Sequence, residues 1–167
     1  MTAQQTIILD KSQIAHKLER MAWQIYENNV NEKEIVLAGI ASNGYELAKK
    51  LKTLLKKISP LEVRLCKVVV NKEQPTSTVE TSLKSSEYRD RSIVVVDDVL
   101  HSGTTLIYGV KHFLNVPLKQ VNTAVLVDRN HKRYPVKADF KGISLSTSLN
   151  ENVKVILEKN RERAVLE

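Results

Sequence analysis

Two adjacent carboxylates, Asp97 and Asp98, stand between an apolar run and a short turn in the stretch VVVDDVLHSGTT, residues 94–105. The turn consists mainly of hydroxyl and glycine residues: His101, Ser102, Gly103, Thr104 and Thr105. Such a turn at the start of a helix is typical of a phosphate-binding loop, because its backbone N–H groups point at an anion and the helix dipole favours negative charge. The carboxylates would repel that phosphate. We therefore expect them to serve another part of the ligand, either vicinal hydroxyls or a bound metal.

A ligand that carries both a phosphate and a diol, such as a ribose 5-phosphate, fits both halves of this stretch. Each half is a weak signal by itself, since acids at a strand end are also ordinary helix caps. The combination is more specific: four apolar residues, two acids and two spacers precede the His-Ser-Gly-Thr-Thr turn.

Alternating apolar segments predict the elements that position these residues. Continuous or alternating apolar runs indicate strands at 34–40, 61–70, 92–96 and 121–127. Apolar residues at spacings of three and four indicate helices at 12–28, 47–58 and 104–114. This alternation predicts an α/β fold with a mostly parallel sheet and helices on both faces. Ligands of such folds bind at the carboxyl ends of the strands, so the end of 92–96 is the expected site.

Bulk properties predict one domain that spans residues 1–167. No apolar run approaches the roughly 20 residues of a membrane span, and the start lacks a secretory pattern, so we expect a cytoplasmic protein with no membrane partner. The single cysteine, Cys66, agrees with a reducing compartment. A net charge of +7 favours anionic partners such as phosphorylated metabolites or nucleic acid.

The stretch at 94–105 resembles the motif with which type I phosphoribosyltransferases bind phosphoribosyl pyrophosphate (PRPP). Within that family the chain is most similar to the pyrimidine operon attenuation regulators that double as uracil phosphoribosyltransferases. IILDKSQIAHKLERMAWQIYENN near the start and AVLVDRNHKRYPVKADFKG at 124–142 carry this second similarity. The resemblance implies a small hood and a flexible flap beside the sheet, the flap being residues 71–91. It also implies that Asp97 and Asp98 are the catalytic residues on the ribose, while the turn at 101–105 binds the 5-phosphate.

The resemblance further implies that a loop after the first core strand holds pyrophosphate, with Mg²⁺ as cofactor. Here that loop is Ala41, Ser42, Asn43 and Gly44, whereas the family has basic side chains of the Lys-Thr-Arg-Gly kind. Loss of two charged donors could cost several kcal/mol, at about 1.5–3 kcal/mol for each hydrogen bond to a charged group. Two functions therefore stay open: a uracil phosphoribosyltransferase, or a PRPP- or nucleotide-sensing RNA-binding regulator with little or no turnover.

Two residues bear on the nucleobase. His101 stands where relatives specific for 6-oxopurines place an acid, and it either lines the phosphate loop only or takes part in proton transfer. Asp128 stands where those relatives use a lysine to meet the purine oxygen, and an acceptor cannot replace that donor. Both departures favour uracil over hypoxanthine or guanine.

A basic segment follows the last strong strand and makes RNA a second candidate partner. Its cations include Arg129, Lys132 and Arg133. Against RNA binding, Ser146 and Leu149 stand where RNA-binding relatives have Pro and Arg, and no aromatic stacking module is interleaved. Scattered histidines and one cysteine predict no protein-built metal cluster. The resemblance implies a homodimer or a larger homo-oligomer.

Overall fold

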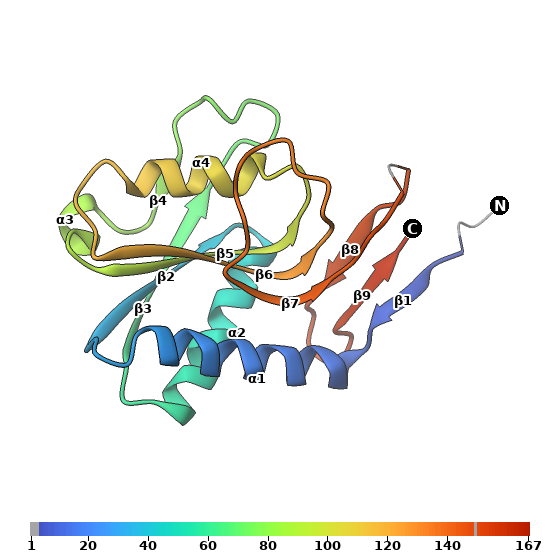
Figure 1. Cartoon of the computed structure of the whole chain (residues 1–167), viewed down its shortest axis with the longest axis horizontal. Coiled ribbons are helices and arrows are strands. Elements are labelled where there is room, and N and C mark those ends of the chain that lie inside the picture. Colours follow the sequence, from blue (N-terminus) through green and yellow to red (C-terminus); the bar gives the residue numbers. More distant parts are fainter. Residues whose placement is uncertain (1–3, 149) are drawn as a thin grey trace.

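A central six-stranded sheet organises the computed structural model, which describes residues 4–148 and 150–167 (Figure 1). The strand order is β4-β3-β2-β5-β6-β7. In chain order these strands are β2 (Glu34–Ile40), β3 (Glu62–Val69), β4 (Glu80–Thr81), β5 (Ser92–Leu100), β6 (Gln120–Asp128) and β7 (Phe140–Ser144). The pairs from β3 through β7 are parallel, and only the short edge strand β4 runs antiparallel to its neighbour. The predicted mostly parallel sheet is confirmed.

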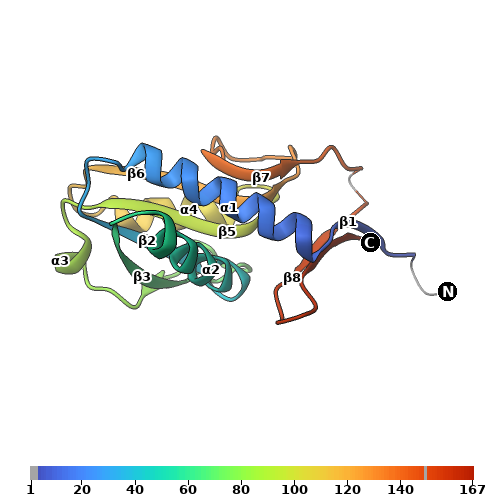
Figure 2. The same ribbon diagram turned by 90° about the horizontal axis from the view of Figure 1, so that it is seen from below.

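Three main helices cover the two faces of the sheet. Helices α1 (Lys11–Asn28) and α2 (Asn43–Ile58) lie on one face, and α4 (Thr104–Phe113) lies on the other (Figures 1 and 2). Two apolar cores result, because side chains alternate between the faces of each strand. Val94 and Val96 pack with α1 and α2, while Ile93 and Val95 pack with α4. The predicted α/β arrangement with helices on both faces is therefore confirmed.

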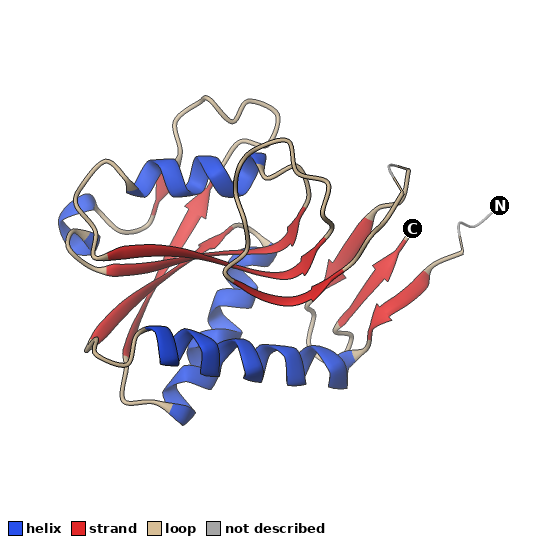
Figure 3. Cartoon of the chain, viewed as in Figure 1, coloured by secondary structure: helices blue, strands red, loops and turns tan. Residues whose placement is uncertain are grey.

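A second, three-stranded antiparallel sheet forms the hood beside the carboxyl ends of the parallel strands (Figure 3). Its order is β1-β9-β8, and the strands are β1 (Thr6–Leu9), β8 (Val153–Ile156) and β9 (Arg163–Leu166). Each strand has four residues, which is too short for an apolar period to stand out in the sequence. The hood thus joins the first and last described parts of the chain.

The segment at 71–91 is more structured than a long loop. It contains strand β4 and the short helix α3 (Ser85–Tyr88), and only residues 71–79 form an extended excursion. Tyr88 is buried, and its hydroxyl donates to Asn115 Oδ1 at 3.1 Å. This bond connects the second half of the segment to the residues that follow α4. Among the described residues, no helix is both long enough and apolar enough to cross a membrane.

Candidate active site

A cavity of about 480 Å³ lies at the carboxyl end of β5, between the parallel sheet, the start of α4 and the hood. The acid pair Asp97 and Asp98 lines it, together with the whole turn from His101 to Thr105. From other elements come Asn43, Lys72, Val155 and Glu167. The structure therefore brings the two halves of the 94–105 stretch into one cavity, at the edge of the sheet where ligands of α/β folds bind.

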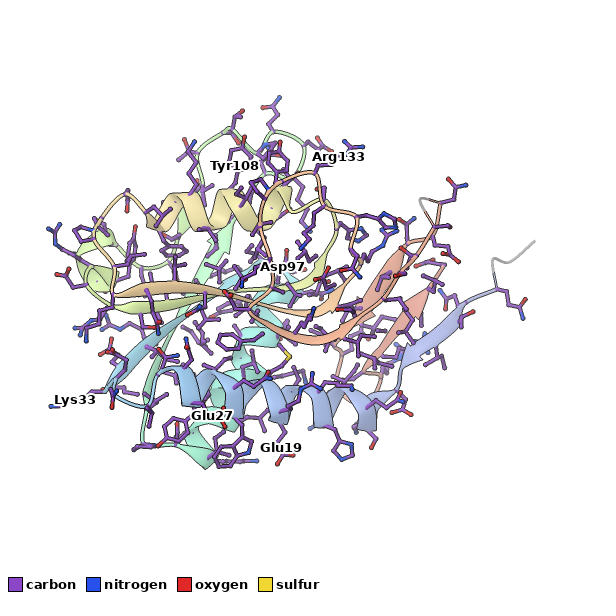
Figure 4. All side chains as sticks on the ribbon, in the orientation of Figure 1. Glu19, Glu27, Lys33, Asp97, Tyr108 and Arg133 are labelled. Carbon is purple, nitrogen blue, oxygen red and sulfur yellow. The ribbon has the colours of Figure 1, made fainter. Side chains whose placement is uncertain are left out.

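The two acids lie within β5 and not in a turn after it. The strand continues to Leu100, and Leu100 pairs with Asp128 of β6. Asp98 N–H donates to Asp97 Oδ1 at 2.9 Å, and Val99 N–H donates to Asp98 Oδ1 at 2.8 Å. The two carboxylates line the same cavity but differ in burial: Asp97 is buried and Asp98 is half-buried. Figure 4 shows Asp97 deep in the molecule, beside the sheet.

Burial raises the pKa of Asp97 well above its usual range, and the adjacent Asp98 carboxylate adds to this rise. A neutral Asp97 can donate a hydrogen bond to the Asp98 carboxylate, which also favours the protonated form. The Lys72 ammonium acts in the opposite direction. The carboxyl of Asp97 is therefore harder to ionise than that of an exposed aspartate.

The turn at 101–105 has the geometry of an anion-binding helix start. Gly103 has a φ of 87° and precedes the first residue of α4. The first helical hydrogen bond runs from Ile107 N–H to Gly103 O at 2.9 Å, so the N–H groups of residues 104–106 lie before it. Ser102 Oγ and Thr104 Oγ1 are 2.8 Å apart and share a hydrogen bond. Backbone and hydroxyl donors therefore converge at one end of the cavity.

The segment after β6 supports this turn from behind. Arg133 N–H and Tyr134 N–H both donate to Ser102 O, at 2.7 and 3.1 Å. A Cβ on Gly103 would meet Val136 Cγ1 at 2.6 Å, so Val136 packs directly against the turn. The sequence gives no sign of this support, because the partners are about thirty residues apart in the chain and are joined through backbone groups.

The predicted pyrophosphate loop, residues 41–44, leads into α2 and includes its first two residues. The helix begins at Asn43, and its first hydrogen bond runs from Glu46 N–H to Ser42 O at 3.2 Å. Of the four residues, Asn43 lines the cavity, and its amide donates to Asp98 Oδ2 at 3.0 Å and to Val155 O of the hood at 2.9 Å. Asn43 therefore connects the acid pair, the hood and the helix that starts here.

Replacing Gly44 with alanine is expected to displace this helix start. A Cβ on Gly44 would lie 2.5 Å from Val96 O and 3.0 Å from Asp97 Cα, both backbone atoms of the central strand. Overpacking of this kind costs typically about 1–3 kcal/mol. We expect a matching loss in the free energy of urea unfolding and a weaker affinity for PRPP. Gly109→Ala is the control, because its Cβ would meet only side chains, at 3.4 Å or more; equal stability of the Gly44→Ala and wild-type proteins would contradict the expected displacement.

Lys72 is a cavity residue that sequence reasoning missed. It stands at the beginning of the 71–79 excursion, lines the cavity and is close enough to lower the pKa values of Asp97 and His101. The only sequence signal was a cation three residues after the strand that ends at Val69. Its ammonium places a positive charge in a cavity whose first loop, 41–44, has none.

Two predicted site residues are placed elsewhere than expected. Asp128 is buried at the end of β6, where its Oδ1 accepts from Asn130 N–H at 3.0 Å, and it does not line the cavity. Arg129 is also buried, and its guanidinium donates to acceptors inside the protein. Arg129 therefore does not belong to an exposed basic face, because its charge is enclosed. His101 lines the cavity as expected, and Arg129 donates to its Nδ1.

The other basic residues of this segment are exposed. Lys132 and Arg133 lie at the surface, and Figure 4 shows Arg133 at the rim of the molecule, away from Asp97. Of the two positions that differ from RNA-binding relatives, Leu149 is outside the described residues. Within residues 4–148 and 150–167, no three His, Cys, Asp or Glu side chains are arranged to hold a metal ion.

The fold and this cavity define a class, and comparison with known proteins agrees with it. The family described as phosphoribosyl transferase domain matches residues 4–158. The chain therefore belongs to this family and is a type I phosphoribosyltransferase.

Within the family the chain is PyrR-like. "Bifunctional protein PyrR" of Macrococcus caseolyticus is 33% identical over 160 residues, which is 92% of this chain and 92% of that protein. "Bifunctional protein PyrR" of Pediococcus pentosaceus is 30% identical over 162 residues, or 91% of this chain and 92% of that protein. The predicted resemblance to the pyrimidine regulators is confirmed.

Solved structures show the same fold. The hypoxanthine phosphoribosyltransferase of Trypanosoma cruzi superposes with a TM-score of 0.77 at 17% identity and covers 96% of this chain and 95% of that one. A hypoxanthine-guanine phosphoribosyltransferase of Bacillus anthracis gives 0.69 at 18% identity, over 84% and 82% of the two chains. At these identities the similarity concerns the fold alone and leaves the nucleobase of this chain open.

Proposed function

We propose that this phosphoribosyltransferase joins uracil to the ribose of PRPP and releases pyrophosphate, acting in the cytoplasm with Mg²⁺ as a homodimer or a larger homo-oligomer. The observation that carries the proposal is one cavity with an acid pair on β5 and an anion-binding turn at the start of α4. The 5-phosphate occupies the turn at 101–105. The ribose hydroxyls occupy the acid pair, so the anomeric carbon faces the remaining space.

In the reaction a base nitrogen forms a bond to the anomeric carbon and gives up its proton to the leaving pyrophosphate or to water, while the bond from that carbon to the pyrophosphate oxygen breaks with its electron pair. Positive charge grows on the ribose during this exchange. Asp97 and Asp98 are the catalytic residues, because carboxylates fixed beside the ribose stabilise that charge without reorganising. The turn at 101–105 and the first turn of α2 hold the two phosphate ends, which fixes the carbon between nucleophile and leaving group.

The residues in the cavity fit a Mg²⁺ ion that arrives with PRPP. Mg²⁺ is usually bound by one or two carboxylates together with substrate phosphates rather than by a cage of protein ligands. Asp98, half-buried and in the cavity wall, supplies such a carboxylate, and Asn43 already fixes its Oδ2. Held by these residues, the ion would neutralise charge on the leaving pyrophosphate.

Replacing Lys72 with alanine is expected to raise KM for PRPP by about 10- to 100-fold, since a hydrogen bond to a charged group contributes about 1.5–3 kcal/mol. We infer that its ammonium contributes the positive charge that the 41–44 segment lacks. Steady-state kinetics with varied PRPP measures the effect. Lys159→Ala is the control for net charge, because Lys159 is exposed and does not line the cavity. An unchanged KM for PRPP in Lys72→Ala would show that Lys72 does not contribute to PRPP binding.

Uracil is the proposed base because the donor that 6-oxopurine relatives place at position 128 is absent. Asp128 is buried, bonds to its own turn and presents no cation to a purine oxygen. The test is a pyrophosphate-release assay with PRPP, Mg²⁺ and a panel of uracil, cytosine, hypoxanthine, guanine and xanthine. Uracil should give the highest kcat/KM. A preference for hypoxanthine would reverse the assignment, and no release with any base would leave a nucleotide-binding regulator.

RNA binding is the second candidate function, favoured by the exposed cations Lys132 and Arg133 beside the phosphate loop. Contacts from such cations to phosphates make affinity fall with salt. The test compares an RNA hairpin from a pyrimidine-gene leader with a shuffled hairpin over a salt series. A specific site should favour the leader hairpin, and the preference should be lost in the Lys132→Ala, Arg133→Ala protein. Equal affinity for both hairpins would indicate attraction to the +7 chain only.

A further inference from the structure

Arg129 is a buried cation that the reaction as described does not use. It is the residue after β6, its side chain and backbone are 5% exposed together, and its guanidinium donates in several directions. Nε donates to Thr147 Oγ1 at 2.9 Å, and one terminal nitrogen donates to Ser148 O at 3.3 Å and to Glu151 O. The other terminal nitrogen contacts His101 Nδ1. Arg129 therefore joins the segment that leads into the hood to the phosphate loop.

The contact with Arg129 fixes the tautomer of His101. A guanidinium has N–H donors and no acceptor, so Nδ1 must be the acceptor and can carry no hydrogen. In a neutral imidazole the hydrogen then belongs to Nε2. His101 lines the cavity, and among the described residues no group forms a hydrogen bond with Nε2. The free Nε2–H therefore lies on the part of the ring that Arg129 does not occupy.

The charges around His101 oppose its protonation. Burial lowers the pKa of His101 first, the Arg129 guanidinium lowers it further, and Lys72 acts in the same direction. Asp98 is the one nearby charge that acts in the opposite direction. A protonated ring would also present an Nδ1–H to the guanidinium, where two donors would face each other. Both charge and hydrogen bonding therefore favour the neutral ring.

We propose that Arg129 is a positioning residue that holds His101 as a neutral Nε2–H donor in the cavity wall, so that the ligand must present a hydrogen-bond acceptor there. His101 then recognises substrate and does not remove a proton from the base, since its one unprotonated nitrogen is occupied by Arg129. The proposal deepens the proposed function by assigning substrate recognition to His101. The identity of the acceptor atom on the ligand rests on that proposed function. A carbonyl oxygen of a pyrimidine base or a ribose oxygen is an acceptor of the required kind.

The direct test is the ¹⁵N spectrum of the imidazole rings in the free protein, which needs no substrate and no activity. Nδ1 of His101 should resonate as an unprotonated nitrogen and Nε2 as a protonated one at pH 7, with His16, exposed on α1, as the internal comparison. His101→Gln assigns the signals. An imidazolium at pH 7, or a hydrogen on Nδ1, would overturn the proposal whether or not the protein transfers phosphoribosyl groups.

Substitutions at position 101 separate a donor from a base. A glutamine amide reaches about as far as Nε2, and an asparagine amide reaches about as far as Nδ1, so only His101→Gln can restore a donor in the cavity. We expect His101→Gln to keep kcat/KM for the base within about tenfold of wild type, and His101→Asn and His101→Ala to lose about 10- to 100-fold, the size of one or two hydrogen bonds. A general base would instead make all three variants equally poor.

The role of Arg129 is tested through the same spectrum. Arg129→Met removes every donor of the side chain and leaves buried acceptors without a hydrogen bond, which can prevent folding. Arg129→Lys is therefore measured as well, because lysine keeps the charge but has fewer donors. In a folded Arg129→Lys or Arg129→Met protein, the His101 ring should populate both tautomers, and the pH profile of kcat/KM should show one further titration that the wild-type profile lacks. Unchanged ¹⁵N shifts and an unchanged profile would assign Arg129 to the fold alone.

Discussion

Asp97→Asn is expected to stabilise the free protein while reducing kcat by about 10²- to 10³-fold, the usual effect of removing a group that stabilises charge in the transition state. The loss follows from the position of Asp97 in the cavity, where charge on the ribose has to be balanced. The gain follows from burial, which raises the pKa of the Asp97 carboxyl well above its usual range. An amide of the same shape carries no charge to desolvate, and its oxygen can still accept from Asp98 N–H.

The stability gain should depend on pH. For a carboxyl whose folded pKa is raised, the stabilising contribution is complete below the unfolded pKa, near 3.8, and is lost as pH rises through the folded pKa. The difference in melting temperature between Asp97→Asn and wild type should therefore grow with rising pH.

Differential scanning calorimetry from pH 4 to pH 8 measures this difference. Asp90→Asn is the matched control, because Asp90 has a side chain that is 71% exposed and a positive φ that asparagine tolerates. The control should change neither kcat nor the pH dependence of the melting temperature. A lower melting temperature for Asp97→Asn at every pH would show that the buried charge stabilises the fold, contrary to the electrostatics derived for the acid pair.

Gly103→Ala is expected to weaken binding of ribose 5-phosphate by about 100-fold or more. Two costs combine at this position. A φ of 87° disfavours an L-residue by about 1–2 kcal/mol, and the new Cβ would lie 2.6 Å from Val136 Cγ1. If the backbone shifts to relieve the strained φ or the contact with Val136, the turn moves. The N–H groups that bind the phosphate then move with it.

A second substitution separates the two costs. Val136→Ala removes the side chain that the new Cβ would meet, so the double variant should recover part of the lost stability but keep the backbone strain. Calorimetric titration with ribose 5-phosphate and urea unfolding of the single and double variants form the cycle. Gly109→Ala, in the middle of the same helix with room for a Cβ, should bind like wild type. If Gly103→Ala bound ribose 5-phosphate as tightly as wild type, the turn at 101–105 would not be the phosphate site.

Long apolar runs made much of the fold predictable. The strands at 34–40 and 92–96 and all three main helices follow from continuous or helical apolar periods, because burial on both faces of a parallel sheet leaves few polar positions. The continuation of β5 through the acid pair was missed, since carboxylates are depleted in strands and resemble a turn. Pairing with β6 outweighs that preference here.

The site shows the same division between local and long-range information. The phosphate loop could be found because its donors are neighbours in sequence. Lys72 and Arg129 could not be assigned to the site from the sequence. The sequence pattern around a cation in a polar segment does not show whether its side chain faces solvent or a cavity. Only the tertiary structure encloses Arg129 among acceptors at 147–151 and places Lys72 beside Asp97. Asp128 was likewise assigned from its position after a strand, while its carboxylate bonds to its own turn.

The most direct test of the account is a calorimetric comparison of ribose 5-phosphate with 2-deoxyribose 5-phosphate in the wild-type protein. One cavity is expected to bind the phosphate at 101–105 and the vicinal hydroxyls at Asp97 and Asp98. Ribose 5-phosphate should bind at one site per chain and compete with PRPP, while the deoxy sugar, which lacks one hydroxyl, should bind at least about tenfold more weakly, as expected for one hydrogen bond to a charged group. Equal affinity for the two sugars, or no competition with PRPP, would contradict the claim.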